Sequence, residues 1–324
     1  MGAISKILKS RQLYMLFVLP FVIVALTITS YYHSSSAPFV VQERGGYLTF
    51  LSTLSPFGQL FLGTIVLLGM AGMIFFINER YKLLQQSTTL PILLYILLIA
   101  WGINSAGMGH ALYASLVFAL ALDRLQVAIT NLKSNGVLFE FGVLSMLAVL
   151  IYPKFVLLLA WAICATLFSG RSTLKDITAL VLGFILPLIF LVFYYFWGNR
   201  LGELPEIFVQ NLLSGDFISL FSVWEWVRLG SLLFVLSISL LHFLARSSAL
   251  VLIHRRFFFA LLSLFFFLAV TFFIIPFDDK SLMYLCALPL AFLYAHFFLV
   301  QRSVIIVNVV FFWLLAACFL PFFI

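Results

Sequence analysis

Long runs of apolar residues alternate along the whole chain with short polar or charged segments, and this pattern is the main structural signal. The runs hold roughly 18–22 residues, which as helix is enough to cross the ~30 Å hydrocarbon core of a bilayer. A helix satisfies its backbone hydrogen bonds internally, whereas an open sheet in lipid leaves its edges unsatisfied. The pattern therefore predicts transmembrane helices throughout the chain.

We predict an all-α fold, a polytopic transmembrane helical bundle with about eleven spans, within a range of about 9–12. Residues 1–324 form a single integral-membrane domain in this interpretation, because no linker or change of composition divides the chain. The expected spans are residues 12–32, 57–78, 88–104, 110–128, 137–152, 154–170, 177–197, 226–245, 256–275, 282–300 and 303–324.

Composition supports this interpretation. Apolar residues make up 65% of the 324 residues, charged residues make up 9%, and the mean hydropathy is +1.21. Soluble domains carry about a quarter charged residues, so this chain lacks the polar surface that solubility requires. In a soluble protein the net charge of +7 would suggest nucleic-acid binding. Here the basic residues lie in short loops between spans, and we expect no nucleic-acid partner.

The distribution of Lys and Arg predicts the orientation, because cytoplasmic loops are enriched in basic residues. With a cytoplasmic N-terminus, thirteen of the eighteen basic residues lie on the cytoplasmic side. The five outside are Arg44, Lys154, Arg200, Arg228 and Lys280. The first apolar run resembles a signal peptide, but it is long and the small residues that could be cleaved lie well past its end. We therefore expect an uncleaved first span and a multi-pass protein of the plasma (inner) membrane.

Two extracytoplasmic loops are long, at about residues 33–56 and 198–225. In the second loop, Pro205 lies between Glu203 and Glu206, which is typical of a helix start. Apolar residues follow, interrupted by Gln210 and Asn211. This pattern predicts a short helix that lies in the membrane interface. The other connections are short, so most neighbouring spans should be antiparallel.

Ionisable residues within the apolar runs are few, and each is a hypothesis for function in a membrane. Glu140 lies near the inner end of its span and either serves a function or extends to the interface. Asp123 and Arg124 lie near the inner end of the preceding span, where a structural ion pair or an interface anchor is expected. No chain of mid-membrane acids resembles a proton relay.

Metal and cofactor chemistry is not predicted. No two of the five histidines are spaced i, i+3 or i, i+4, and Cys164, Cys286 and Cys318 lie singly inside apolar runs. The chain has no glycine-rich phosphate loop, serine nucleophile elbow or HExxH motif. We therefore expect no metal and no cofactor.

The turns on the outer side carry the densest polar chemistry. The candidate residues there are Glu43, Arg44, His110, Lys154, Arg228, Asp278, Asp279 and Lys280. Arg and Lys are the usual protein partners of phosphate, so these cations could hold a lipid diphosphate. A carboxylate such as Glu43 or Asp279 could act as a general base toward a hydroxyl acceptor. The structural alternative is that turns need polar residues and that interfacial Lys and Arg anchor helices.

One stretch of the sequence sharpens the functional hypothesis. In order, it contains Phe141-Gly142-Val143-Leu144, Ile151-Tyr152-Pro153-Lys154-Phe155, Gly170-Arg171-Ser172, Leu182-Gly183, Pro187, Tyr194-Tyr195 and Gly198-Asn199. Residues 141–200 thereby resemble the middle of polytopic glycosyltransferases of the GT-C type, which use polyprenyl-linked sugars. The resemblance implies that the first outer loop carries the catalytic acid, and Glu43 is the only acid in that loop. The whole chain also resembles a family of polytopic inner-membrane proteins of Bacteroidetes, which implies a compartment and no activity.

Three classes of function follow. The first is a glycosyltransferase-like enzyme that acts on polyprenyl-linked sugars at the outer face of the inner membrane, with Glu43 as catalytic residue. The second is a transporter or lipid-handling protein, which predicts a polar cavity at the bilayer midplane near Glu140. The third is a non-catalytic membrane subunit of an envelope assembly, which predicts a membrane protein partner. All three contact membrane lipids, and the first adds a polyprenyl-phosphate-linked glycan as partner.

Overall fold

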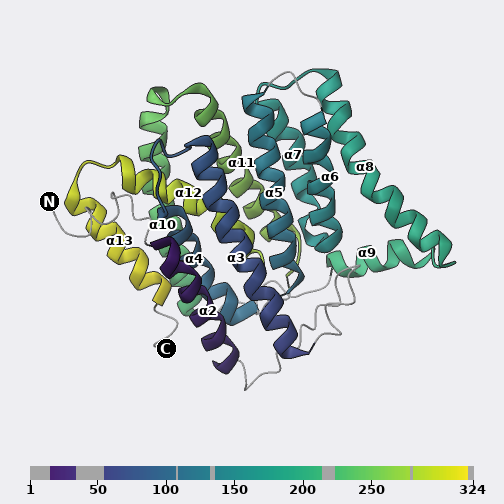
Figure 1. Ribbon diagram of the computed structural model, residues 1–324, viewed down its shortest axis with the longest axis horizontal. Coiled ribbons are helices and arrows are strands. Elements are labelled where there is room, and N and C mark those ends of the chain that lie inside the picture. Colours follow the sequence, from purple (N-terminus) through teal and green to yellow (C-terminus); the bar gives the residue numbers. More distant parts are fainter. Residues whose placement is uncertain are drawn as a thin grey trace.

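The computed structural model describes residues 15–33, 55–106, 109–131, 136–213, 223–277 and 280–319. Within these ranges the chain forms helices and contains no strand, which confirms the all-α prediction. Most helices run between two ends of one bundle, as Figure 1 shows. One short helix, α9, runs from the far tip of α8 back to one end of the bundle (Figure 1), and we call that end the α9 end.

The helices of the described residues are α2 (Met15–His33), α3 (Pro56–Tyr81), α4 (Leu90–Ala106), α5 (His110–Thr130), α6 (Gly136–Ile151), η3 (Pro153–Phe155), α7 (Leu157–Phe168), α8 (Leu174–Trp197), α9 (Glu203–Leu213), α10 (Val223–Arg246), η4 (Ser247–Ala249), α11 (Leu252–Ile274), α12 (Met283–Val300) and α13 (Val304–Phe319). Each predicted span overlaps one of the long helices. The predicted interfacial helix corresponds to α9, with Pro205 in its first turn.

The number of spans is supported only in part. Among the described residues, six helices are long and apolar enough to cross a membrane: α3, α5, α8, α10, α11 and α12. The apolar parts of α2, α4, α6, α7 and α13 are shorter, at 10–17 residues. The twelve residues of α7, for example, reach only about 18 Å as helix. Length therefore supports a multi-pass membrane protein, with six helices of the described residues long enough to span, and the number of about eleven spans stays a prediction.

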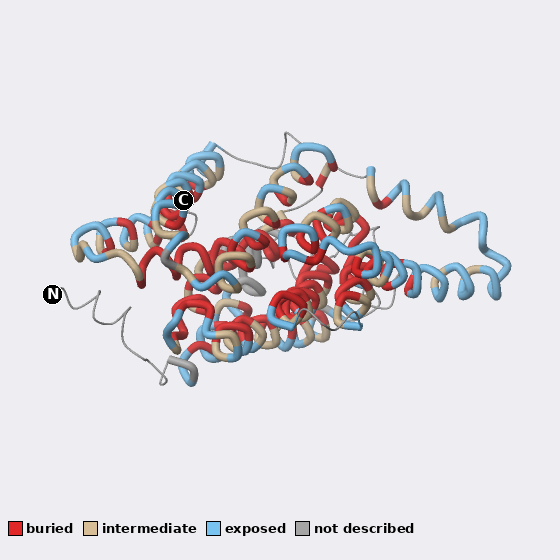
Figure 2. The backbone as a smooth tube through the Cα atoms, turned by 90° about the horizontal axis from the view of Figure 1, so that it is seen from above, coloured by how far each residue is buried: buried red, intermediate tan, exposed pale blue. Residues whose placement is uncertain are grey.

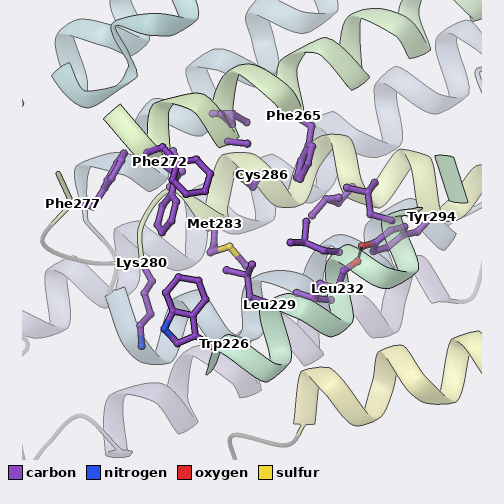
Figure 3. A pocket seen from close by; sticks show the side chains of 17 residues that line it. Trp226, Leu229, Leu232, Phe265, Phe272, Phe277, Lys280, Met283, Cys286 and Tyr294 are labelled. Atoms are coloured by element: carbon purple, nitrogen blue, oxygen red, sulfur yellow. Dashed lines mark hydrogen bonds between the residues drawn. The ribbon is translucent and has the colours of Figure 1, made fainter. Parts of the chain in front are cut away.

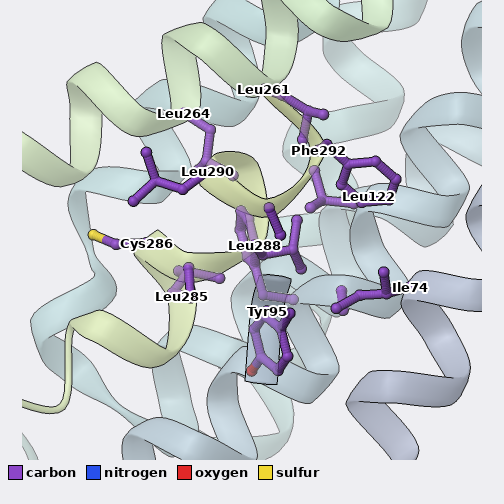
Figure 4. Close-up of a cluster of buried hydrophobic side chains, with 14 of the residues drawn as sticks. Ile74, Tyr95, Leu122, Leu261, Leu264, Leu285, Cys286, Leu288, Leu290 and Phe292 are labelled. Carbon is purple, nitrogen blue, oxygen red and sulfur yellow. The ribbon is translucent and has the colours of Figure 1, made fainter. Parts of the chain in front are cut away.

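The core of the bundle is built around α12. Every residue from Tyr284 to Leu299 is buried, and the helix packs against α4, α10, α11 and α5. Figure 4 shows side chains from several of these neighbours, such as Tyr95 of α4 and Leu122 of α5, gathered around this central rod. A helix that is apolar on every side can face either lipid or protein in a membrane, and α12 is enclosed by protein along its length.

Two buried tyrosines tie α12 to its neighbours. The Tyr95 hydroxyl of α4 donates to the Tyr284 carbonyl at 3.3 Å. The Tyr294 hydroxyl of α12 donates to the Leu232 carbonyl of α10 at 2.7 Å. Hydrogen bonds between helices in a membrane contribute on the order of 0.6–2 kcal/mol each. They also hold α4 and α10 at defined heights along α12.

The end opposite α9 is held by arginines, and we call it the arginine end. Three arginines there donate to backbone carbonyls at the C-terminal ends of other helices. They are Arg171, which donates to Ala128 and Asn131 at the end of α5, Arg246, which donates to Val300 of α12, and Arg256, which donates to Ser169 after α7. The last carbonyls of a helix have no partner within it, and a cation there is favoured by the helix dipole.

The close crossing of α6 and α8 depends on two glycines. A Cβ atom added at Gly142 would lie 2.4 Å from the Leu180 carbonyl oxygen, and one at Gly183 would lie 2.4 Å from the Phe139 carbonyl oxygen. One turn later, Pro187 lies inside α8. Beyond this point α8 diverges from the bundle (Figure 1), and Figure 2 shows the α8–α9 arm as largely exposed.

We expect Gly142→Ala to lower the free energy of unfolding by about 1–3 kcal/mol, because the added methyl group forces the two helices apart. Gly72→Ala is the matched control, since a Cβ atom at this glycine of α3 meets nothing within 4 Å. Denaturant unfolding of the detergent-purified protein measures both. Equal stability of the two variants would contradict the tight crossing.

Candidate functional site

The structure describes four of the eight residues proposed from the sequence for the outer rim. Glu43, Arg44, Asp278 and Asp279 lie outside the described residues. His110, Lys154, Arg228 and Lys280 are described, and all four lie at the α9 end. The first three are buried, with 2%, 5% and 2% of their surface exposed. Three cations buried or half-buried at one end of the bundle need a structural or a chemical explanation.

Two turns from distant parts of the sequence meet at the α9 end. One is η3 with the preceding Tyr152, and the other is the segment 275–277 and 280–282 between α11 and α12. The hydroxyls of Tyr152 and Ser281 lie 2.8 Å apart in a buried hydrogen bond. The Lys154 ammonium lies 5.4 Å from the centre of the Phe277 ring, a cation–π contact. These contacts hold Lys154 beside the turn that carries Lys280.

The first turns of α10 supply the rest of the charge. Glu225 forms an ion pair with Lys280, and only 16% and 13% of the two side chains are exposed. Arg228 follows one helical turn after Glu225, so the two opposite charges lie on the same side of α10. The segment 275–277 and 280–282 and the start of α10 thus bring together Lys154, Lys280 and Arg228. We call these three residues the cation cluster.

The helix α9 contacts the same region at η3. Asn211 is its buried residue, while most of the rest of the helix remains exposed. The polar face with Glu203 and Glu206 and the apolar face are segregated, as is typical of a helix in the membrane interface. The prediction of an interfacial helix in this loop agrees with that arrangement. Its position beside η3 could not be read from the sequence.

His110 is the first residue of α5 and is buried. Since α5 and α6 pack as antiparallel neighbours, the start of α5 lies at the same end as Tyr152 and η3. His110 therefore belongs to the α9 end, as the sequence predicted.

An apolar groove opens next to the cation cluster. It lies between α10, α11 and α12, and its volume is about 170 Å³. Figure 3 shows Lys280 and Trp226 at one end of the lining and Tyr294 at the other. Sequence reasoning did not find this groove. A usable signal was present, because Leu229, Leu232, Leu233 and Leu236 follow the i, i+3, i+4, i+7 spacing of one helix face.

The acids at the arginine end have structural partners. Glu140 is half-exposed and pairs with Arg124 at 3.2 Å. Asp123 is buried, accepts a hydrogen bond from the Tyr81 hydroxyl at 3.0 Å and lies 3.6 Å from Arg80. Their location at the end of the bundle agrees with the structural interpretation of both residues. The groove described above and a second apolar pocket on α8, formed by Leu188, Ile189, Val192, Phe193 and Phe196, are not lined by Glu140.

Metal binding has no candidate in the described ranges, where no three His, Cys, Asp or Glu side chains gather closely enough to hold an ion. The three cysteines are free thiols, two of them buried and Cys164 half-buried.

Comparison of the chain with family models, with curated proteins and with solved structures gives no significant match.

We expect Glu225→Lys to lower the free energy of unfolding by about 3 kcal/mol, because it removes the partner of Lys280 and adds a cation beside Arg228. The double variant Glu225→Lys with Lys280→Glu should recover most of this loss, because it restores an ion pair of opposite polarity. Denaturant unfolding of the three proteins measures the coupling. A double variant no more stable than Glu225→Lys alone would contradict the pairing.

Proposed function

We propose that the protein is a glycosyltransferase-like enzyme of the cell envelope that acts on polyprenyl-phosphate-linked sugars at the outer face of the inner membrane. The observation that carries the proposal is the position of the cation cluster beside the mouth of an apolar groove. A polyprenyl phosphate has a long hydrocarbon chain, which matches the apolar groove, and an anionic head, which matches the cation cluster.

Charge supports an anionic ligand at the cluster. Lys280 pairs with Glu225, Arg228 lies one helical turn after Glu225 on α10, and Lys154 lies over the Phe277 ring. Ionised donors form the strongest hydrogen bonds to phosphate oxygens, and they are strongest where water is excluded. The burial of Lys154 and Arg228 therefore favours binding of a phosphate over simple anchoring at the interface.

Glu43 is the proposed general base. Its carboxylate takes the proton of an acceptor hydroxyl, the acceptor oxygen forms a bond to the anomeric carbon of the sugar, and the bond from that carbon to the phosphate oxygen breaks. The electron pair of the broken bond leaves with the lipid phosphate, and the cation cluster stabilises the charge that develops there. The loop of Glu43 and Arg44 connects α2 to α3, and the helix ends that it joins lie at the α9 end (Figure 1).

The remaining candidates are assigned supporting roles at the same end. Arg44 adds a cation for the phosphate, and Asp278 and Asp279, which adjoin Phe277 and Lys280 in sequence, orient the hydroxyl groups of the sugar or acceptor. His110 is a hydrogen-bond donor to the same substrate. No cofactor takes part in this scheme.

We expect Glu43→Gln to abolish transfer, because the amide cannot accept the acceptor's proton. The assay uses the purified full chain in proteoliposomes with polyprenyl-phosphate-linked, radiolabelled hexose and a lipid extract of the producing cells as source of acceptor, and it counts label in new products.

Glu206→Gln is the matched control for this assay. It removes an exposed carboxylate of α9 at the same end and should leave the rate unchanged. Unchanged product from Glu43→Gln would remove the catalytic role and favour a lipid-handling protein or a non-catalytic subunit instead.

A further inference from the structure

We propose that the groove between α10, α11 and α12 seats the hydrocarbon chain of a single-tailed lipid phosphate, with its phosphate at Lys280. The inference rests on the proposed function for the choice of an isoprenoid chain. The groove itself sets the number of tails, the depth to which a tail inserts and the end at which the charge must lie.

The lining of the groove is suited to hydrocarbon. Leucines of α10 form one wall, Phe265 and Phe272 of α11 form another, and Met283 and Cys286 of α12 form the floor. The Tyr294 hydroxyl at the far end is already used in its hydrogen bond to the Leu232 carbonyl. The groove has a volume of about 170 Å³ and is partly open, so a hydrocarbon chain can enter it from the side.

The dimensions favour one chain. From Met283 to Tyr294 the lining follows α12 for about 16 Å at 1.5 Å per residue, which is about half of a ~30 Å hydrocarbon core. A volume of about 170 Å³ spread over that length leaves room for a single narrow chain. A second acyl chain would have to remain in the bilayer.

Charge determines which end of the ligand lies at the mouth. Lys280 is the one cation in the lining of the groove, and Trp226 lies beside it in Figure 3. The lysine ammonium has three donors and places a positive charge at the mouth of the groove. Arg228 lies one helical turn after Glu225 on α10 and adds a second positive charge near the head. A neutral lipid would gain nothing from this arrangement.

The test measures binding of tritiated farnesyl phosphate to the full chain in phosphatidylcholine nanodiscs. Ala269→Trp fills the groove from α11, and we expect it to weaken binding at least about tenfold, equivalent to 1.4 kcal/mol. The matched control Ala245→Trp adds the same side chain at an exposed site of α10 outside the groove and should change binding less than about twofold. If Ala269→Trp fails to fold, Leu233→Trp, at a 43% exposed groove position, replaces it with the same expectation.

Lys280→Gln tests the head. We expect it to weaken binding of farnesyl phosphate about tenfold and to leave binding of farnesol, which has no charge, unchanged. Equal binding of farnesyl phosphate by the wild type and by the folded groove-filling variant would overturn the proposal. Displacement of the probe by dioleoyl phosphatidic acid or by inorganic phosphate, as effective as displacement by unlabelled farnesyl phosphate, would also overturn it.

The two proposals fail in different ways. Binding of farnesyl phosphate that depends on Ala269 and Lys280, in a protein that yields no glycan product, keeps the groove and removes the enzyme. Glycan transfer that is insensitive to Ala269→Trp keeps the enzyme and removes the groove as the seat of the lipid chain.

Discussion

Burial of α12 on all sides sets the positions of its neighbours and, through them, of both polar ends. In lipid the hydrophobic effect does not drive helices together, so packing depends on close approach and on hydrogen bonds. Ala287, Ala291 and Ala295 recur every four residues along α12 and are all buried, which lets neighbouring backbones come close. The hydroxyls of Tyr95 and Tyr294 then fix α4 and α10 against the rod. The groove lies beside α12, whose Met283 and Cys286 form part of its lining.

The two ends of the bundle use cations for different purposes. At the arginine end, guanidinium groups donate to the last carbonyls of α5, α7 and α12, where a positive charge is stabilised by the helix dipole. Arg171, for example, is almost fully buried but also pairs with Asp176 at 3.0 Å. At the α9 end, Lys280 pairs with Glu225 at the mouth of a groove, and Lys154 lies over an aromatic ring. This contrast supports a ligand-binding role for one end and a structural role for the other.

Much of the fold could be predicted from apolar periodicity, and the site could be predicted only in part. Runs of apolar residues marked the helices, and Pro205 between two glutamates marked α9, because these signals are local in sequence. The full number of spans stays a prediction, since six helices of the described residues are long and apolar enough to cross a bilayer while the apolar runs of α6 and α7 are shorter. Counting spans correctly placed Lys154 and Lys280 at the same end, because every second connection between antiparallel helices lies on the same side.

The contacts within the site could not be predicted, because they join residues far apart in the chain. The hydrogen bond between Tyr152 and Ser281 spans 129 positions. The groove could not be predicted for a similar reason. Its leucine stripe on α10 has the same pattern as a fully packed helix face, and only the position of α11 leaves space beside it. The crossing at Gly142 and Gly183 depends on backbone approach, which the resemblance of the stretch 141–200 to GT-C type enzymes did not describe.

The proposed function requires the α9 end to face the outside of the cell and the arginine end to face the cytoplasm. Single cysteines at Gly202, in the turn before α9, and at Ser248, in η4, are both at exposed positions and test this directly in intact cells with a membrane-impermeant maleimide. We expect labelling of Gly202→Cys in intact cells and labelling of Ser248→Cys only after permeabilisation. Labelling of Ser248→Cys in intact cells, with Gly202→Cys protected, would contradict it.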